Sequence, residues 1–504
     1  MANNVYGGPG NDYLVGTSGQ DVIIGYSGDD TLIGGGGNDI LWGSYGKNLL
    51  IGGDGDDWYN LLNSDENVIV EEAGQGVDKV TSYSAMYFLG ANLENLSMSG
   101  SVPSVGIGNS LNNDIRIYTA GGSLWGEAGN DTLKGNTAAD ALNGGEGSDR
   151  LSGGGGDDFL QGDAMYGTPT LLNSGADTLY GDAGNDTLNG QGDLDSLFGG
   201  EGNDYYIDDD AGDVIVEIAG QGTDTLATSA SYVELQANVE NLALASPEWH
   251  IAIGNELNNL VDDGAGDGVV SAEQGSDTVR AGAGDDVILG GDGSDRLEGA
   301  AGNDQLEGDS SFLFGDMLSP GSDTLVGGAG NDVLLGQAGD DSLFGDAESA
   351  GQASISGSDS YDGGAGNDVL FDSSTTSADS YSWGQGQGND TVTDLGGSAD
   401  SLAISGQLTR GNVWLTHVAN TQDLRVNLIG STDSVVVKGF FATTSGQAAG
   451  AGAVESLTLA NGNVLMTGSV ACQQLIQAMS SMAPPAAVTS TPLAINTLIA
   501  NAWA

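Results

Sequence analysis

The sequence contains very few basic residues, one cysteine and two histidines. Lysine and arginine together number 10, against 71 aspartates and glutamates, which gives a formal net charge of −61 at neutral pH. Such a charge repels nucleic acid and anionic membrane surfaces, so neither is expected as a partner. The single cysteine, Cys472, excludes an intrachain disulfide. A secreted chain would therefore need other staples, for which metal ions are the candidate.

Long hydrophobic runs are also missing. No stretch reaches the 18 apolar residues of a membrane span, and the start, Met1-Ala-Asn-Asn-Val-Tyr, lacks the basic and apolar segments of a signal peptide. We therefore expect no transmembrane segment and no Sec-type export. Proline is scarce, at 8 residues, whereas glycine reaches 87 residues without a Gly-X-Y period, which excludes collagen.

The glycines follow a nine-residue period. Each unit approximates Gly-Gly-x-Gly-x-Asp-x-apolar-x, with an aspartate at position six and an apolar residue at position eight. Six units follow one another without a gap, with Asn48 as the one departure at position six, and start at Gly7, Gly16, Gly25, Gly34, Gly43 and Gly52. Further units start at Gly126, Gly135, Gly144, Gly153, Gly181, Gly199, Ala281, Gly290, Gly299, Gly327, Gly336 and Gly363.

The chemistry of this unit predicts a coil that needs a metal. Glycine permits left-handed backbone angles, so the first six residues can form a tight turn, and the last three can form a short strand whose central side chain points inward. Two units then complete one flattened coil. Stacked coils bring the aspartates into columns of like charge, which a divalent cation neutralises. Calcium suits such a site because it accepts carboxylate and carbonyl oxygens, whereas zinc prefers His or Cys.

The alternative is a solenoid in which Asp, Asn and Gly serve only as turn formers and the charges keep the chain soluble. A turn needs no aspartate at every ninth position, and an unneutralised column of aspartates opposes folding. We therefore favour calcium binding over this alternative.

These units resemble those of the RTX family, the repeats-in-toxin or haemolysin-type calcium-binding proteins, over most of residues 7–371. The resemblance implies an all-β fold, a right-handed parallel β-roll with on the order of twenty calcium ions between successive turns. It also implies that position-six carboxylates and turn carbonyls hold the metal. The implied metal ligands are Asp12, Asp21, Asp30, Asp39, Asp57, Asp131, Asp140, Asp149, Asp158, Asp186, Asp204, Asp277, Asp286, Asp295, Asp304, Asp332, Asp341 and Asp368.

A longer period relates two tandem modules, because Ala73-Gly-Gln-Gly recurs 146 positions later at Ala219. The segments between repeat blocks lose the nonapeptide but keep β-branched runs. The expected organisation is a first RTX block at 1–60, a metal-free solenoid spacer at 61–125, a second block at 126–207, a second spacer at 208–262, a third block at 263–379, a C-terminal β cap at 380–467 and a secretion-signal-like tail at 468–504.

The tail contains a short helical stretch from Ala471 and resembles a type I secretion signal. The alternative is a helix that docks on the cap. If an ABC exporter reads this end, the crowded aspartates keep the chain unfolded at submicromolar cytosolic calcium, and millimolar external calcium folds it.

Three inserts, at 163–176, 309–322 and 346–358, interrupt repeats and are expected to be surface loops. Their apolar residues either form a binding patch or pack within their own loop. These residues are Met165, Tyr166, Phe312, Phe314 and Met317.

No enzyme is expected. Only His250 and His417 are present, too few for the zinc site of RTX-type metalloproteases, and no Gly-x-Ser-x-Gly elbow occurs. The main hypothesis is a secreted calcium-binding β-roll with a structural or self-assembling role, such as a matrix, surface-layer or filament subunit. The alternatives are an adhesin or ligand-binding module that uses the inserted loops, and the export portion of a toxin or secreted hydrolase.

Overall fold

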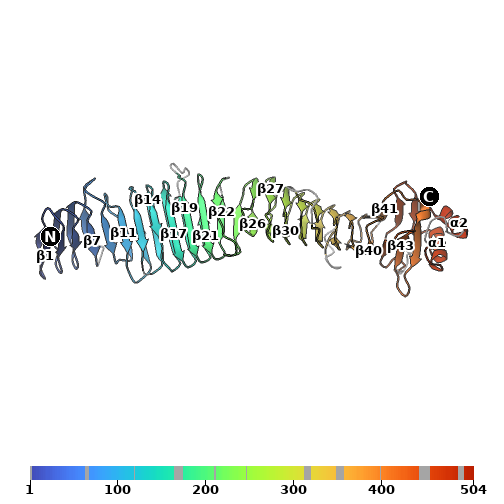
Figure 1. Ribbon diagram of the computed structural model, residues 1–504, viewed down its shortest axis with the longest axis horizontal. Helices are drawn as coiled ribbons and strands as arrows, with labels where there is room; N and C mark the ends of the chain where they lie inside the picture. The colour runs from blue at the N-terminus through green and yellow to red at the C-terminus, as the bar shows by residue number, and fades with distance from the viewer. Residues whose placement is uncertain are drawn as a thin grey trace. The chain divides into compact units, whose positions relative to one another are not determined.

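The structure is a computed structural model that describes residues 3–62, 67–118, 120–163, 174–208, 212–245, 247–311, 319–347, 357–397, 399–441, 454–485 and 493–503. It divides into an N-terminal unit of residues 1–229 and 236–239 and a C-terminal unit of residues 230–235 and 240–504. In both units short parallel strands stack as the coils of a β-solenoid, which confirms the predicted fold class (Figure 1).

The N-terminal unit contains three ladders of parallel strands. The first consists of β1 (Asn3–Tyr6), β3 (Asp21–Ile24), β5 (Ile40–Trp42), β7 (Trp58–Leu61), β9 (Lys79–Ser82), β11 (Asn95–Met98), β13 (Asp114–Ile117), β15 (Thr132–Lys134), β17 (Arg150–Gly155), β19 (Thr178–Ala183), β21 (Ser196–Glu201) and β23 (Val214–Ile215). The second consists of β2 (Tyr13–Val15), β4 (Thr31–Gly36), β6 (Leu49–Asp54) and β8 (Val68–Val70). The third consists of β10 (Met86–Phe88), β12 (Ser104–Ile107), β14 (Gly122–Ala128), β16 (Ala141–Glu146), β18 (Phe159–Asp163), β20 (Thr187–Asn189), β22 (Tyr205–Asp208) and β24 (Thr225–Thr228).

The C-terminal unit contains two ladders. The first runs through β26 (Asn241–Leu244), β28 (Leu260–Asp262), β30 (Thr278–Arg280), β32 (Arg296–Ala301), β34 (Thr324–Ala329), β36 (Ser342–Phe344), β38 (Val369–Asp372) and β40 (Asn389–Asp394). The second runs through β25 (Tyr232–Glu234), β27 (His250–Ile253), β29 (Gly268–Ser271), β31 (Val287–Leu289), β33 (Gln305–Glu307), β35 (Val333–Leu335), β37 (Ser360–Asp362), β39 (Ser380–Trp383), β41 (Ser401–Ile404), β45 (Ser456–Leu459) and β46 (Val464–Met466).

The strand register confirms that two nonapeptides make one coil. Ile23 pairs with Leu41, and Leu32 pairs with Leu50, in each case 18 residues along the chain. The spacers continue the same ladders with coils of other lengths, so that Tyr59 pairs with Val80. The solenoid therefore does not end where the nonapeptides stop.

The core of each repeat coil is one layer of position-eight side chains. Ile23, Leu32, Leu41 and Leu50 are all 0% exposed, whereas their neighbours along the strand are partly exposed. Burying such a side chain contributes about 1.5–3 kcal/mol. The turns between strands depend on glycine. Gly37 at position four has φ +96°, which glycine adopts readily, and it lies against the backbone of Gly19 in the adjacent coil.

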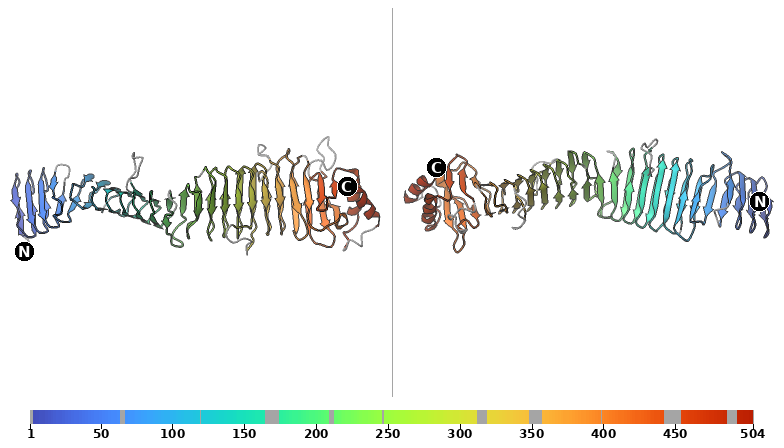
Figure 2. Two further views of the ribbon diagram at one scale, coloured as in Figure 1. Left: turned by 90° about the horizontal axis from the view of Figure 1, so that it is seen from above. Right: turned by 180° about the vertical axis from the view of Figure 1, so that it is seen from behind.

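An antiparallel group follows the last coils of the C-terminal unit. It is formed by the 3₁₀ turn Arg410–Asn412, β42 (Val413–His417), β43 (Leu424–Leu428) and β44 (Ser434–Val437), and β44 pairs with β40. Helix α1 (Val470–Ser480) packs on β42, where the Leu415 N–H donates to Met479 Sδ at 3.3 Å, and α2 (Leu493–Ala502) packs on α1 (Figure 2). Neither helix, nor any other in the described residues, is long and apolar enough to cross a bilayer.

Candidate calcium sites

Backbone hydrogen bonds fix one oxygen of each position-six aspartate. The Asp21 N–H donates to Oδ1 of Asp39 in the next coil at 2.7 Å, and the Asp39 N–H donates in the same way to Asp57 at 2.7 Å. The same bond recurs in the second and third blocks. We call this series the aspartate ladder. It stacks one carboxylate directly on the next coil, at the start of each short strand.

The second oxygen of most ladder aspartates is buried and has no hydrogen-bond partner. A buried acceptor in this state destabilises a fold by about 1–3 kcal/mol unless something satisfies it. Fifteen of the implied ligands have such an Oδ2 atom: Asp30, Asp39, Asp57, Asp131, Asp149, Asp158, Asp186, Asp204, Asp277, Asp286, Asp295, Asp304, Asp332, Asp341 and Asp368.

Most of these oxygens lie beside the first glycine of their own repeat, and in most coils a carbonyl oxygen faces the aspartate oxygen there; the units of Asp277 and Asp286 have Ala272 and Ala281 at position one. A methyl group added at Gly34 would lie within 3.0 Å of both Asp39 Oδ2 and the carbonyl oxygen of Gly52 in the next coil. The same arrangement recurs along the blocks, for example at Gly126 and Gly327. We call this space the cradle. In most units position one is glycine, which leaves this space free of a side chain. The possible metal-ligand atoms around the space are all oxygen, which fits calcium and not zinc.

Burial makes these carboxylates poor anions on their own. It raises the pKa of Asp39 to about 6, of Asp131 to about 7 and of Asp177 to about 9, with like charges in adjacent coils raising them further and backbone N–H donors lowering them. Near neutral pH the metal-free ladder therefore either takes up protons or carries a costly buried charge. A divalent cation in the cradle would remove both penalties.

Three implied ligands are arranged differently. In Asp12, Asp21 and Asp140 the Oδ2 atom accepts a backbone N–H from its own turn, from Gly8, Thr17 and Asn136 respectively. Asp12 and Asp21 belong to the first coils, and Oδ1 of Asp21 has no partner from a preceding aspartate. The Oδ2 atoms at these three positions therefore need a cation less than those of the other fifteen aspartates.

The ladder also includes aspartates that the sequence pattern did not assign. Asp177, Asp323 and Asp359 complete units that an insert splits, and Asp195 belongs to a unit starting at Gly190. A signal was present in these units, since Asp177 and Asp323 precede the same Thr-Leu strand start and Gly190 lies nine residues after Gly181.

The inserts leave the ladders intact, because Leu151 still pairs with Leu179 and Leu297 with Leu325. The residues considered for a binding patch lie outside the described part of the chain; they are Met165, Tyr166, Phe312, Phe314 and Met317.

Comparison with known families gives two matches. The model of the RTX calcium-binding nonapeptide repeat (4 copies) matches residues 6–41, 33–61, 124–164, 172–206, 253–288, 271–306, 319–349 and 356–373. The model of the haemolysin-type calcium binding protein related domain matches residues 423–466, which include β43 to β46. No curated protein matches the chain.

One solved structure that is similar to part of the chain is the extracellular lipase LipA from Serratia marcescens. The sequence identity is 16%, the TM-score is 0.16, and the match covers 44% of this chain and 43% of the lipase chain. The chain therefore spans less than half of that protein's length.

Proposed function

This chain is an RTX protein with calcium-binding nonapeptide repeats, and on that premise we propose that it is a secreted, non-catalytic β-roll that folds when it meets extracellular calcium. The observation that carries the proposal is the aspartate ladder, whose buried Oδ2 atoms face carbonyl oxygens across glycine in all three blocks. A non-catalytic role is supported because the ladder accounts for most of the buried aspartates.

The magnitude of calcium linkage is sufficient for such a switch. A site with a Kd of about 10⁻⁴ M, at the tight end of extracellular modules, adds about 1.4 kcal/mol when calcium is tenfold above Kd. Ten such sites together would add about 14 kcal/mol, as much as the entire stability of a typical domain. Submicromolar calcium adds almost nothing. The metal concentration outside a cell thus decides whether the repeats fold.

This dependence supports export of an unfolded chain through a type I (ABC) system. In the folded C-terminal unit α1 is docked, with Leu475 and Met479 both 0% exposed. In a calcium-poor compartment the same segment would be undocked and accessible to an exporter. Residues 468–504 are the segment we propose as the signal.

A structural, self-assembling role is supported by the first coil. Within the described residues β1 and β2 each pair on one side only, and Val5, which faces the core side in register with Ile23, remains partly exposed. An unpaired strand edge beside an incompletely covered core is a template for a second copy. We propose that this coil stacks on another molecule in calcium.

The test is a titration from chelator to about 10 mM calcium, followed by circular dichroism and light scattering, with magnesium as the control ion. Calcium is expected to produce a cooperative gain of β signal that magnesium does not reproduce. A chain already folded in chelator would refute calcium-dependent folding.

Self-association is tested separately with Val5→Lys, which places a charge on the open coil, against Tyr13→Lys, where the side chain is already 71% exposed. We expect Val5→Lys to abolish the growth in scattering and Tyr13→Lys to leave it unchanged. A wild-type chain that folds in calcium but stays monomeric at all concentrations would refute the assembling role alone.

A further inference from the structure

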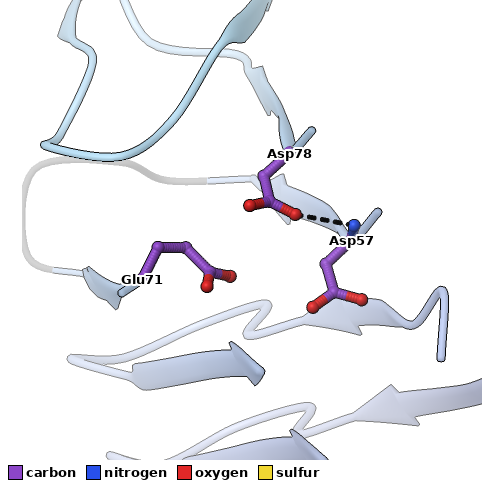
Figure 3. Close-up of side chains that lie close together, drawn as sticks. All are labelled: Asp57, Glu71 and Asp78. Atoms are coloured by element: carbon purple, nitrogen blue, oxygen red, sulfur yellow. Dashed lines mark hydrogen bonds between the residues drawn. The ribbon is translucent and has the colours of Figure 1, made fainter. Parts of the chain in front are cut away.

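Three buried clusters join ladder aspartates to acids that the repeat pattern does not predict. They consist of Asp57, Glu71 and Asp78; of Asp204, Glu217 and Asp224; and of Asp346, Asp359 and Asp372. We call them the block-end clusters. In each, ligand oxygens of the three carboxylates lie within 4.8 Å of one another. Figure 3 shows the first cluster, in which the Glu71 carboxylate points towards Asp57 and Asp78.

Each cluster contains an acid at position one of the coil, which is glycine in most repeats. Strands β6 and β8 pair in a register that places Glu71 one coil beyond Gly52, the position-one glycine of the preceding coil. The equivalent pairs in the other clusters are Glu217 with Gly199 and Asp372 with Gly345. In the other repeat coils this position is glycine or alanine, which places no polar side chain in the cradle. Here a carboxylate enters it.

A tyrosine hydroxyl accompanies each of these acids. The tyrosine stands at position eight, where other repeats have an aliphatic residue, and its hydroxyl donates to the position-one acid. The three pairs are Tyr59 with Glu71, Tyr206 with Glu217, and Tyr361 with Asp372. In the first cluster the oxygen that accepts this bond lies beside the ladder aspartate, because a methyl group added at Gly52 would lie within 3.0 Å of Asp57 Oδ2, the Tyr59 hydroxyl and Glu71 Oε1.

The first and third clusters contain buried carboxylate oxygens that have no hydrogen-bond partner, whereas in the second cluster both oxygens of Glu217 accept hydrogen bonds, from the Tyr206 hydroxyl and the Ile218 N–H. Glu71 is 8% exposed and Asp57 is 2% exposed, and neither Oε2 of Glu71 nor Oδ2 of Asp57 has a hydrogen-bond partner. Oδ2 of Asp359 and of Asp372 are in the same state in the third cluster. Across the described part of the chain, no Lys, Arg or His forms an ion pair with Asp57, Glu71 or Asp78.

A fourth acid at the position-one site offers an internal comparison. Asp263 follows the register pair Asp262 and Arg280 and so occupies this coil position, and it is 4% exposed. Its partner is the imidazole of His250, with Nε2 at 2.7 Å from Oδ1 and both side chains fully buried. There the chain supplies an imidazole to the buried acid. The first block-end cluster, in the described residues, has three carboxylates and no such group.

We propose that each block-end cluster binds one calcium ion through three carboxylates, and that these ions are held more tightly than the ions of the repeat cradles. The inference rests on the proposed calcium function but concerns residues outside the nonapeptide motif. Affinity in all-oxygen calcium sites rises with the number of charged ligands and with rigidity. The cradle has one unpartnered carboxylate oxygen facing a carbonyl, whereas the cluster brings three carboxylates and a fixed phenol to the same place.

The test uses the full chain folded in calcium and then equilibrated with chelators of increasing strength. Bound calcium is counted after removal of free ions, and circular dichroism reports whether the roll persists. In the wild type we expect three ions to be retained at free calcium at least tenfold below the level at which the others leave. Glu71→Gln should reduce the retained number to two, because it keeps the hydrogen-bond acceptor for Tyr59 and removes one charge.

The matched control is Glu72→Gln, an exposed neighbour, which should retain three. If Glu71→Gln does not fold, Glu71→Gly restores an ordinary position one and Asp372→Asn tests the third cluster independently; each should lose one tightly held ion. Release of all ions over a single calcium range, with Glu71→Gln identical to Glu72→Gln, would overturn the proposal and indicate that the clusters share protons. A chain that binds no calcium at all would overturn both this inference and the proposed function.

Discussion

The substitution Asp39→Asn should have opposite effects with and without calcium. The chain itself indicates that an asparagine is accommodated in the ladder, because Asn48 occupies position six. Its Oδ1 accepts the Asp30 N–H at 2.9 Å, and its Nδ2 donates to Asn67 at 2.9 Å. The introduced asparagine would keep the bond from Asp21 and direct its amide towards the Gly52 carbonyl, in place of an unpartnered oxygen.

The magnitude follows from the pKa of Asp39, which burial raises to about 6. The unfolded chain has a carboxyl pKa near 3.9, so above pH 6 the ionised carboxylate destabilises the metal-free fold by about 3 kcal/mol. Because the folded pKa is the higher one, this penalty is absent below about pH 4 and complete above about pH 6. The asparagine substitution removes it. In calcium the same change instead removes one bound ion, worth about 1.4–2.7 kcal/mol at 10 to 100 times its Kd.

The assay is denaturant unfolding at pH 7.5, in 10 mM calcium and again in chelator with an osmolyte that favours the folded state. Asp39→Asn should be less stable than the wild type in calcium and more stable in chelator. Asp29→Asn, at an exposed aspartate outside the ladder, should change stability by no more than about 0.5 kcal/mol in either condition. If Asp39→Asn were destabilising to the same extent in both, the carboxylate would serve only as a hydrogen-bond acceptor, and the reasoning would fail.

Gly34→Ala should destabilise the calcium-loaded chain by more than about 2 kcal/mol, because the new methyl group enters the cradle. Gly36→Ala should fold normally, because the atoms nearest to its new methyl group would lie 3.8 Å away. Calcium titrations of the two variants test the difference. Acidification in chelator from pH 7.5 to about 4.5 should raise the β signal, since ladder pKa values of about 6 to 9 exceed those of the unfolded chain, and a flat signal would contradict the raised values. The calcium concentration at the midpoint of folding should rise over the same pH range, because protons compete with calcium for the carboxylates. Met479→Ala should loosen α1 from β42 by about 2–5 kcal/mol, seen as faster proteolysis of the helix with unchanged calcium binding.

The repeat coils could be predicted from the sequence because every feature they need is local. Turn glycines, the position-six acid and the position-eight apolar residue fall within nine residues, and the register of Leu32 with Leu50 follows from the period. The split units were harder. Asp177 lies in a ladder 28 residues from Asp149, and only the pairing of strands on either side of the insert identifies it.

The block-end acids could not be predicted by the same means. Glu71 stands at position one, but the turn that follows it, Glu71-Glu-Ala-Gly-Gln-Gly-Val-Asp78, contains two residues more than the motif and so falls out of phase. Its role depends on the pairing of β8 with β6, which no nine-residue window contains. The register of the spacers is therefore what the sequence alone leaves open.

The solenoid uses two different means of stabilisation along one type of ladder. A repeat coil buries one apolar side chain per nonapeptide, and its unpartnered carboxylates make it depend on a cation. The first spacer instead buries a denser apolar set, namely Val80, Leu89, Leu93, Leu96 and Met98. Asn113, where the ladder re-enters the second block, satisfies its amide with the carbonyl oxygens of Leu93 and Glu94. The first spacer thus relies mainly on apolar burial, whereas a repeat coil carries unpartnered carboxylates. Repeat coils and spacer coils meet at the block ends, where Glu71 and Glu217 each add a carboxylate and a contact with a tyrosine. Calcium bound there would therefore couple the folding of the metal-dependent coils to that of their hydrophobic neighbours.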